Sequence, residues 1–217
     1  MGLIPFQKPD KVVMQKASDF QGIFEFYPLE KGYGVTIGNS IRRVLLSSLE
    51  GYAITNVKIN GVEQEFSTIP GVVEDVVNLV LNLKQIRFKP KGDEHEETIF
   101  VSISGQETFS AADISKASNN FEVLNPEFVI CNMEKSVKLE MEIHVKRGRG
   151  YVSEEENKPI DPPIGLITLD SIFSPIVKVS YDVESFRVGQ DTDYEKLVLE
   201  IKTDGSIHPE EALKEAA

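Results

Sequence analysis

The spacing of apolar residues changes from strand-like to helical within the first fifty residues of the chain. Residues 20–27 (FQGIFEFY) alternate between apolar and polar positions, which is typical of a strand with one buried face. From Ile37 to Leu49 the apolar residues recur at helical spacing, and Gly51 is placed to end that helix. The pattern predicts a strand followed by an amphipathic helix.

A turn signal follows between two β-patterned runs. Residues 54–59 and 62–66 are joined by Asn60-Gly61, a dipeptide typical of a tight type I′ hairpin turn. We therefore expect residues 54–66 to form a β-hairpin.

From residue 67 onward the pattern predicts one helix, then mostly strands, then a last helix. Residues 67–84 (STIPGVVEDVVNLVLNLK) predict a helix that Ser67 or Thr68 would cap. A short final helix is expected after His208, because Pro209 suits a first helical turn. The strands expected between these two helices are 98–104, 127–131, 137–145, 164–169, 176–186 and 195–202.

The predicted helix at 37–49 carries more apolar surface than contact with one sheet requires. At 100° per residue its apolar side chains cover an arc of about 200°, whereas a surface helix needs about 100°. These side chains are Ile37, Ile41, Val44, Leu45, Leu46 and Leu49. Either another element of the same chain covers the excess or a second copy does, and the small number of predicted helices favours a second copy.

Two adjacent arginines on this helix point in different directions. Arg42 falls inside the apolar arc, where its guanidinium needs a partner or must extend past the apolar surface to water. Arg43 lies about 100° further round. On that face, shared with Asn39 and Ser47, its planar fork suits carboxylates or carbonyls of another protein.

The glycines of GYGVTIG (32–38) raise the question of a phosphate-binding loop. Their spacing lacks the Gly-Lys-Ser/Thr of a P-loop and is no clean dinucleotide fingerprint. No apolar strand run comes immediately before them, because Pro28-Leu29-Glu30-Lys31 intervenes. A tight turn into the helix explains these glycines better than a phosphate site.

Composition narrows the classes of protein that fit. The chain has 217 residues, enough for one large or two small domains, and its single cysteine favours a reducing compartment. The net charge of −12 disfavours a free-standing nucleic-acid binder, since such proteins neutralise phosphates with Lys and Arg. The sequence shows no signal peptide and no run of about 20 apolar residues that could span a bilayer, so we expect a cytoplasmic protein.

An enzyme would need a catalytic or metal site, and the candidate residues do not assemble one. Cys131 lies in a β pattern typical of a small buried residue. The three histidines, which lack the spacing of metal ligands, are His95, His144 and His208. The acidic runs, which fit solvated or interface charges better than an acid–base pair, are Glu74-Asp75 and Glu154-Glu155-Glu156. We expect no catalytic residue, metal ligand or cofactor.

An RNA-binding module would use Arg147, Arg149 and Tyr151 as a basic and aromatic patch. Two arginines are few against a net charge of −12. A solvated hairpin tip or a contact with another protein explains the segment better.

Several blocks of the sequence resemble one known family. GYGVTIGNSIRRVLLSSLEG (32–51) resembles the helix typical of the N-terminal domain of the bacterial RNA polymerase α subunit. Residues 57–84 are similar to the family's next block. VKRGRGYV, IFSPIVKVSYDVE and KLVLEIKTDGSIHPEEALKEAA also resemble family blocks, in the same order. Together they span nearly the whole chain.

The resemblance implies an α+β fold with two subdomains. An α/β dimerisation subdomain would combine both chain ends, residues 1–51 and 171–217, and a mostly β subdomain would be inserted at residues 52–170. The family's domain homodimerises and is the platform on which the β and β′ subunits assemble into the core polymerase. It has no catalytic residue, cofactor, membrane contact or small-molecule ligand of its own.

The family's interfaces imply three sets of residues here. The dimer set is Ile37, Ile41, Val44, Leu45, Leu46, Leu49 and Leu213. The set for the β subunit is Arg43, Gly38, Asn39, Ser67, Thr68, Glu74 and Asp75. The set for the β′ subunit is Arg147, Arg149, Tyr151, Ser174 and Pro175.

Two differences from the family's full-length chain affect these expectations. The C-terminal domain that contacts promoter DNA is absent from this sequence, so no direct DNA binding is expected. The final helix stops before the roughly 12–15 residues that an isolated helix needs. We therefore expect the sequence to be a fragment of a larger protein.

Overall fold

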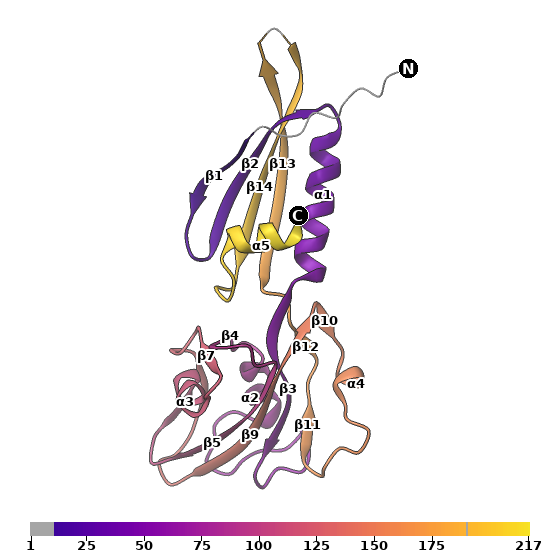
Figure 1. Cartoon of the computed structure of the whole chain (residues 1–217). Helices are drawn as coiled ribbons and strands as arrows, with labels where there is room; N and C mark the ends of the chain where they lie inside the picture. Colours follow the sequence, from indigo (N-terminus) through magenta and orange to yellow (C-terminus); the bar gives the residue numbers. More distant parts are fainter. Residues whose placement is uncertain (1–10, 190) are drawn as a thin grey trace. The chain divides into compact units, whose positions relative to one another are not determined.

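The computed structural model describes residues 11–189 and 191–217, which form two compact units (Figure 1). The first unit combines Met1–Leu49 with Ser174–Ala217, and the second is the continuous segment Glu50–Phe173. Among these described residues, several sheets and five helices make the fold α+β, as the family resemblance implies. Among the described residues no helix is long and apolar enough to cross a membrane.

The first unit is a four-stranded antiparallel sheet with two helices packed against it. The strand order is β1-β2-β14-β13, so the strand nearest the C-terminus, β14, lies between β2 and β13. Helices α1 and α5 pack against the apolar side chains of this sheet. The bounds are β1 Lys11–Ala17, β2 Gln21–Glu30, α1 Tyr33–Ser48, β13 Ile176–Val188, β14 Asp191–Thr203 and α5 Pro209–Ala216.

The second unit is built on another antiparallel sheet, with the order β11-β3-β9-β5. Three two-stranded sheets, β4-β7, β6-β8 and β10-β12, and three short helices complete it. The bounds of the main elements are β3 Glu50–Ile59, α2 Val76–Leu83, β5 Glu96–Ser104, α3 Ala111–Ala117, β9 Lys138–Arg149, α4 Glu154–Asn157 and β11 Leu166–Thr168. The short strands are β4 Phe88–Pro90, β6 Thr108–Ser110, β7 Phe121–Val123, β8 Val129–Asn132, β10 Tyr151–Val152 and β12 Ser171–Ile172.

The strand predicted from the alternating pattern at 137–145 is confirmed, and it corresponds to β9. Its core-facing residues are Leu139, Met141, Ile143 and Val145, all buried. The residues between them are polar and partly exposed. β9 pairs with β3 on one side and β5 on the other, so it is an inner strand of this sheet.

The predicted hairpin at 54–66 is wrong, although its turn exists. The amide of Val62 donates to the carbonyl of Ile59 (3.1 Å), and Gly61 has φ +82°. Asn60 does not have positive φ, as a type I′ turn would require, so the chain leaves the sheet instead of folding back along β3. β3 pairs with the distant strands β9 and β11.

Two predicted helix boundaries also need correction. The helix expected at 67–84 begins only at Val76, because Pro70-Gly71 turns the chain, with Gly71 at φ +78°. Asp75 provides the cap in place of Ser67 or Thr68, and its Oδ1 accepts from the amide of Asn78 (2.7 Å).

At the other helix, α1 ends at Ser48 when Leu49 turns to extended backbone. Gly51, expected to end that helix, lies within β3 opposite Gly148.

Candidate protein-interaction site

Helix α1 lies directly on its sheet because two glycines face the strands. A Cβ at Gly38 would lie 2.7 Å from Cδ2 of Tyr181 and 2.9 Å from Cδ1 of Leu197. A Cβ at Gly34 would lie 2.7 Å from Cγ1 of Val183. Gly38, expected at the β-subunit contact, therefore packs against its own chain. The Gly-x-x-x-Gly spacing is the signal that could have revealed this close approach.

The N-terminus of α1 is occupied by a carboxylate of the same chain. Glu195 of β14 accepts from the amide of Gly32 at Oε1 (2.9 Å) and from the amide of Gly34 at Oε2 (3.0 Å). The first-turn amides and the helix dipole favour an anion at this position. The glycine-rich loop is thus a helix start capped by Glu195, which supports the sequence argument against a phosphate loop.

The apolar residues expected at a dimer interface fall into two groups. Leu45, Leu49 and Leu213 are buried in the core of the first unit. The others remain partly exposed, and they are Ile37, Ile41, Val44 and Leu46. On a helical wheel, Ile37, Ile41 and Val44 lie about 40–100° to one side of the sheet-facing direction defined by Gly34, Gly38 and Leu45. Only the partly exposed group offers apolar surface to another molecule.

The two arginines of α1 have different surroundings. Nε of Arg42 donates to the carbonyl of Val179 on β13 (3.2 Å), which supplies the partner that its position in the apolar arc requires. Arg43 is exposed, and among the described residues none pairs with its guanidinium. Asn39, one turn earlier, is exposed as well. Arg43 is therefore available for binding in a way that Arg42 is not.

Residues 62–75 of the second unit form the loop that contains the other expected β-subunit contacts. Glu74 accepts from the amide (2.7 Å) and Nδ2 (2.8 Å) of Asn132, and Asp75 caps α2, so both carboxylates also stabilise the fold. Ser67 donates to the carbonyl of Gln64 (2.8 Å). Thr68 is exposed.

Sequence reasoning missed the two most exposed apolar side chains of the same loop. Phe66 is 81% exposed and Val73 is 79% exposed. No periodic pattern marks them, because the loop has neither strand nor helix spacing.

Arg147 and Arg149, expected at the β′ contact, share one carboxylate. Arg149 donates from Nε (3.0 Å) and Nη2 (2.7 Å) to Oε1 of Glu50, and Arg147 pairs with Oε2 of the same residue. The hydrogen bond from Arg149 and the charges of both arginines lower the pKa of Glu50. Tyr151 is 63% exposed.

The remaining two expected β′ contacts lie in the first unit. Ser174 accepts at Oγ from the amide of Ile176 (3.3 Å), and Pro175 is buried.

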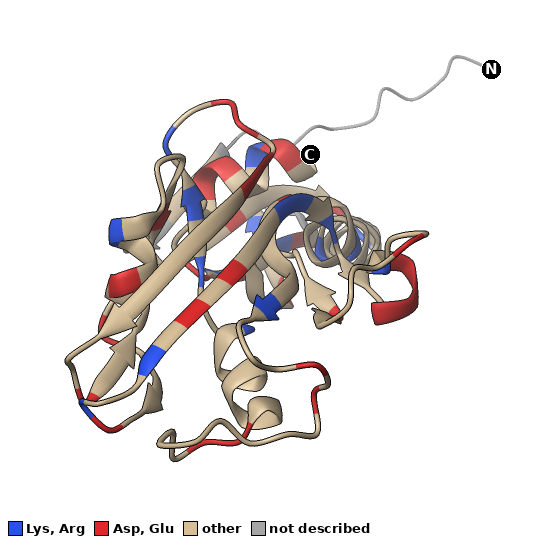
Figure 2. Ribbon diagram, turned by 90° about the horizontal axis from the view of Figure 1, so that it is seen from below, with Lys and Arg blue, Asp and Glu red and all other residues tan. Residues whose placement is uncertain are grey.

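The charged residues are dispersed over the ribbon, with Lys and Arg interspersed among Asp and Glu (Figure 2). Arg147 and Arg149 are partly neutralised by Glu50, which weakens the case for an RNA-binding patch. The acidic run at 154–156 forms the exposed first turn of α4.

The residues weighed for an enzyme have structural surroundings. Cys131 is fully buried, and burial raises the pKa of its thiol to about 12. His144 contacts Thr98 (Nδ1 to Oγ1, 3.0 Å), His95 contacts Arg147 (3.2 Å), and His208 accepts from the amide of Glu210 (3.3 Å) as the cap of α5. Within the part of the chain that the structure describes, no cluster of His, Cys, Asp and Glu could hold a metal ion.

Comparison with known proteins matches residues 57–174 to the RNA polymerase Rpb3/RpoA insert domain. The whole chain is 59% identical to the DNA-directed RNA polymerase subunit alpha of Cytophaga hutchinsonii and 58% identical to that of Flavobacterium psychrophilum. Over 97% of its length it is 51% identical to the subunit alpha of Salinibacter ruber. The chain spans 66% of the length of the first two relatives and 64% of the third.

Proposed function

The chain belongs to the family of bacterial RNA polymerase α subunits that contain the Rpb3/RpoA insert domain, and on that basis we propose that it is a cytoplasmic, non-catalytic assembly subunit. Two copies dimerise through the first unit, and the dimer is the platform on which the β and β′ subunits assemble. The relatives' names identify them as RNA polymerase α subunits. At the level of single residues, the proposal depends on the apolar face of α1 for dimerisation and on Arg43 for binding of β.

The dimer part of the proposal is supported by the apolar surface that α1 leaves uncovered. Ile37, Ile41 and Val44 are partly exposed, and they lie beside the sheet-facing line of the helix. α5 also packs against α1. Covering these side chains with the same face of a second copy would bury them without moving α1 from its sheet.

The β part of the proposal is supported by Arg43. Its guanidinium is exposed on a helix that the two glycines and Glu195 hold in place. Such a fixed, unpaired fork suits a carboxylate or a row of carbonyls on a partner. We assign the second β contact to the loop 62–75, and the β′ contacts to Arg147, Arg149, Tyr151 and Ser174, whereas Pro175 is buried and is left out of this set.

The test is assembly with β and β′ after co-expression. Arg43→Ala should fold and dimerise normally and lose association with β by about 2–5 kcal/mol, the range for a truncated buried charge pair. Arg187→Ala, which removes an exposed arginine elsewhere in the same unit, is the matched control. Retention of β by Arg43→Ala at the wild-type level would reject the role of Arg43.

A second variant tests dimerisation separately. Val44→Glu places a charge on the partly exposed apolar face and should give a folded monomer in analytical ultracentrifugation. Ser47→Glu introduces the same charge on an exposed position of α1 and should remain dimeric. A dimeric Val44→Glu would place the interface elsewhere.

A further inference from the structure

Strand β5 forms one edge of the main sheet of the second unit. Within the described residues its only partner strand is β9. The pairing runs without a register shift from Glu96 opposite Lys146 to Ser104 opposite Lys138. Nine residues of regular, extended backbone therefore leave every second amide and carbonyl directed away from the sheet.

This edge lacks the features with which proteins usually prevent edge pairing. After Glu97 the strand reads Thr-Ile-Phe-Val-Ser-Ile-Ser, without a charge, a proline or a bulge. Natural edges of this length are generally blocked by one of these features or covered. Phe100 in the middle of the strand is 67% exposed. The edge is thus suited to accept another strand.

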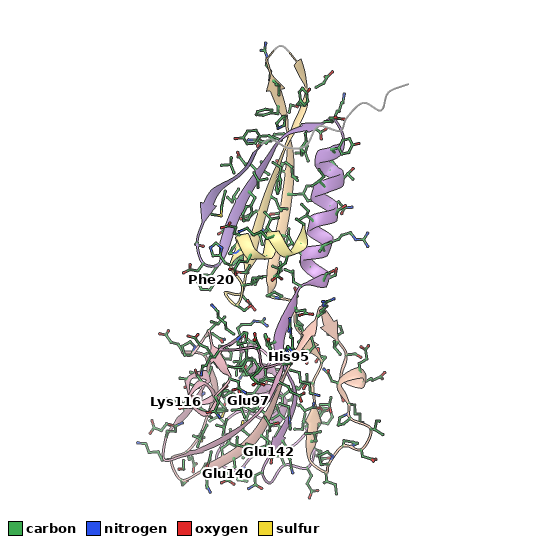
Figure 3. All side chains as sticks on the ribbon, viewed as in Figure 1. Phe20, His95, Glu97, Lys116, Glu140 and Glu142 are labelled. Carbon is green, nitrogen blue, oxygen red and sulfur yellow. The ribbon has the colours of Figure 1, made fainter. Side chains whose placement is uncertain are left out.

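The surface beside the edge indicates the charge of that strand. A groove of about 390 Å³ lies over the face of the sheet from β3 across β9 to β5, and its lining residues are Lys58, Asn60, Phe100, Val101, Ser102, Glu140, Met141 and Glu142. Glu140 is opposite Ser102 and Glu142 is opposite Phe100 in the β5–β9 pairing. Both carboxylates come from β9, as Figure 3 shows.

The geometry of a sheet allows a long basic side chain to reach these carboxylates. A strand added to β5 would lie about 9.6 Å from β9, two strand spacings away. The short side chain of Ser102 leaves space above β5 for a lysine or arginine extending towards Glu140. This carboxylate already pairs with Lys138 and accepts from Nδ2 of Asn60 (3.1 Å), so a basic residue of the partner would share it with Lys138. At the other end, Glu96 favours a second basic residue, and Phe100 favours an apolar or aromatic neighbour.

We propose that the free edge of β5 binds an extended segment of a partner protein by strand addition, and that this segment alternates basic and apolar residues on the face above Phe100. Backbone hydrogen bonds to β5 provide the affinity, and Glu96 and Glu140 select for positive charge. Strand addition of this kind is a common mode of peptide recognition. The site is separate from the residues assigned above to β, β′ and the dimer.

The test uses the whole chain and synthetic fluorescent peptides measured by anisotropy. The probe is an eight-residue peptide with Arg or Lys at its two ends and Val, Thr and Phe between them, and a second version has Glu at both ends. Two further versions are N-methylated at alternate residues, so that each blocks one edge of the peptide backbone. We expect the basic peptide to bind, the version methylated on one edge to lose about a hundredfold in affinity as several backbone bonds vanish, and the other methylated version to bind normally.

Protein variants provide the second readout. Phe100→Lys and Glu140→Gln should each weaken the basic peptide by about three- to fivefold, the range for a cross-strand or exposed charge pair. Phe66→Lys, which changes an even more exposed aromatic residue of the same unit, should have no effect on peptide binding.

Three outcomes would overturn the proposal. Equal binding of both methylated peptides would exclude backbone pairing at the edge. Equal binding of the acidic peptide would exclude the assigned charge preference. Absence of peptide binding together with self-association that Phe100→Lys abolishes would mean that the edge pairs with a second copy of this chain.

Discussion

Replacing Gly38 with valine tests the packing of α1 against its sheet. The added Cβ alone would lie 2.7 Å from Tyr181 and 2.9 Å from Leu197, closer than carbon atoms approach in folded proteins. Overpacking of this kind costs about 1–3 kcal/mol. Valine recovers only about 0.3–0.5 kcal/mol of helix propensity relative to glycine. The expected net loss of stability in the first unit is therefore about 0.5–2.7 kcal/mol.

Native-state hydrogen exchange measures this loss in the right part of the chain, because the two units need not unfold together. The protected amides of α1 and β14 should exchange about two- to a hundredfold faster in Gly38→Val, while those of β9 in the second unit stay unchanged. Asn39→Val is the matched control. It introduces the same side chain at the next, exposed position of α1, where valine and asparagine have similar helix propensities.

The result that would refute this reasoning is unchanged or slower exchange in Gly38→Val. It would mean that Tyr181 and Leu197 move aside without loss, and that the two glycines of α1 have another role. Equal losses in Gly38→Val and Asn39→Val would point to helix propensity in place of packing.

Three further predictions follow from single contacts. Glu195→Gln should weaken the start of α1 by about 1 kcal/mol, seen as faster exchange of the Gly34 amide, and Glu215→Gln on the exposed side of α5 should not; an unchanged Gly34 amide would reject the capping role. Because the pKa of Glu50 is lowered in the folded state, its ion pairs stabilise the fold at neutral pH and lose that effect as the pH falls below the unfolded value of 4.5. Glu50→Gln should therefore cost up to about 1 kcal/mol at pH 7 and progressively less as the pH falls from 4.5 through the lowered pKa of the folded state, and a loss independent of pH would show that charge is not the cause. The thiol of Cys131, with its pKa near 12, should react with a thiol reagent at pH 8 about a thousandfold more slowly in the folded than in the unfolded protein, and rapid labelling of the folded chain would contradict its burial.

Elements with a strong internal pattern could be predicted from the sequence. β9 alternates over its whole core-facing length, and α1 and α5 have clear helical spacing or a proline start. Prediction was weaker where a local signal competes with distant contacts. Asn60-Gly61 does form a turn, but which strand pairs with β3 is decided by residues more than eighty positions away. The pattern at 67–84 predicts a helix that includes Pro70-Gly71, but these two residues turn the chain and the helix begins only at Val76.

The sequence predicts in which direction the side chains of α1 point, but it does not predict which residues they contact. The helical wheel separates Arg42 from Arg43, and the structure gives them different surroundings. The helical wheel alone does not show that Leu45 and Leu49 are buried in the chain's own core, because their burial depends on how closely the sheet approaches α1. Glu195 has no local signal at all, since it meets α1 only when the two ends of the chain come together.

The position of β14 between β2 and β13 determines the order in which the two units can form during synthesis. The second unit is one continuous segment, so all of its strands are available once Phe173 has left the ribosome. The first unit must wait, because β2 lacks its inner neighbour until β14 has been made. Until then α1 has no complete sheet to pack on and its apolar face stays open. Because the second unit is inserted between the two halves of this sheet, the proposed dimer surface cannot form until translation has passed Thr203.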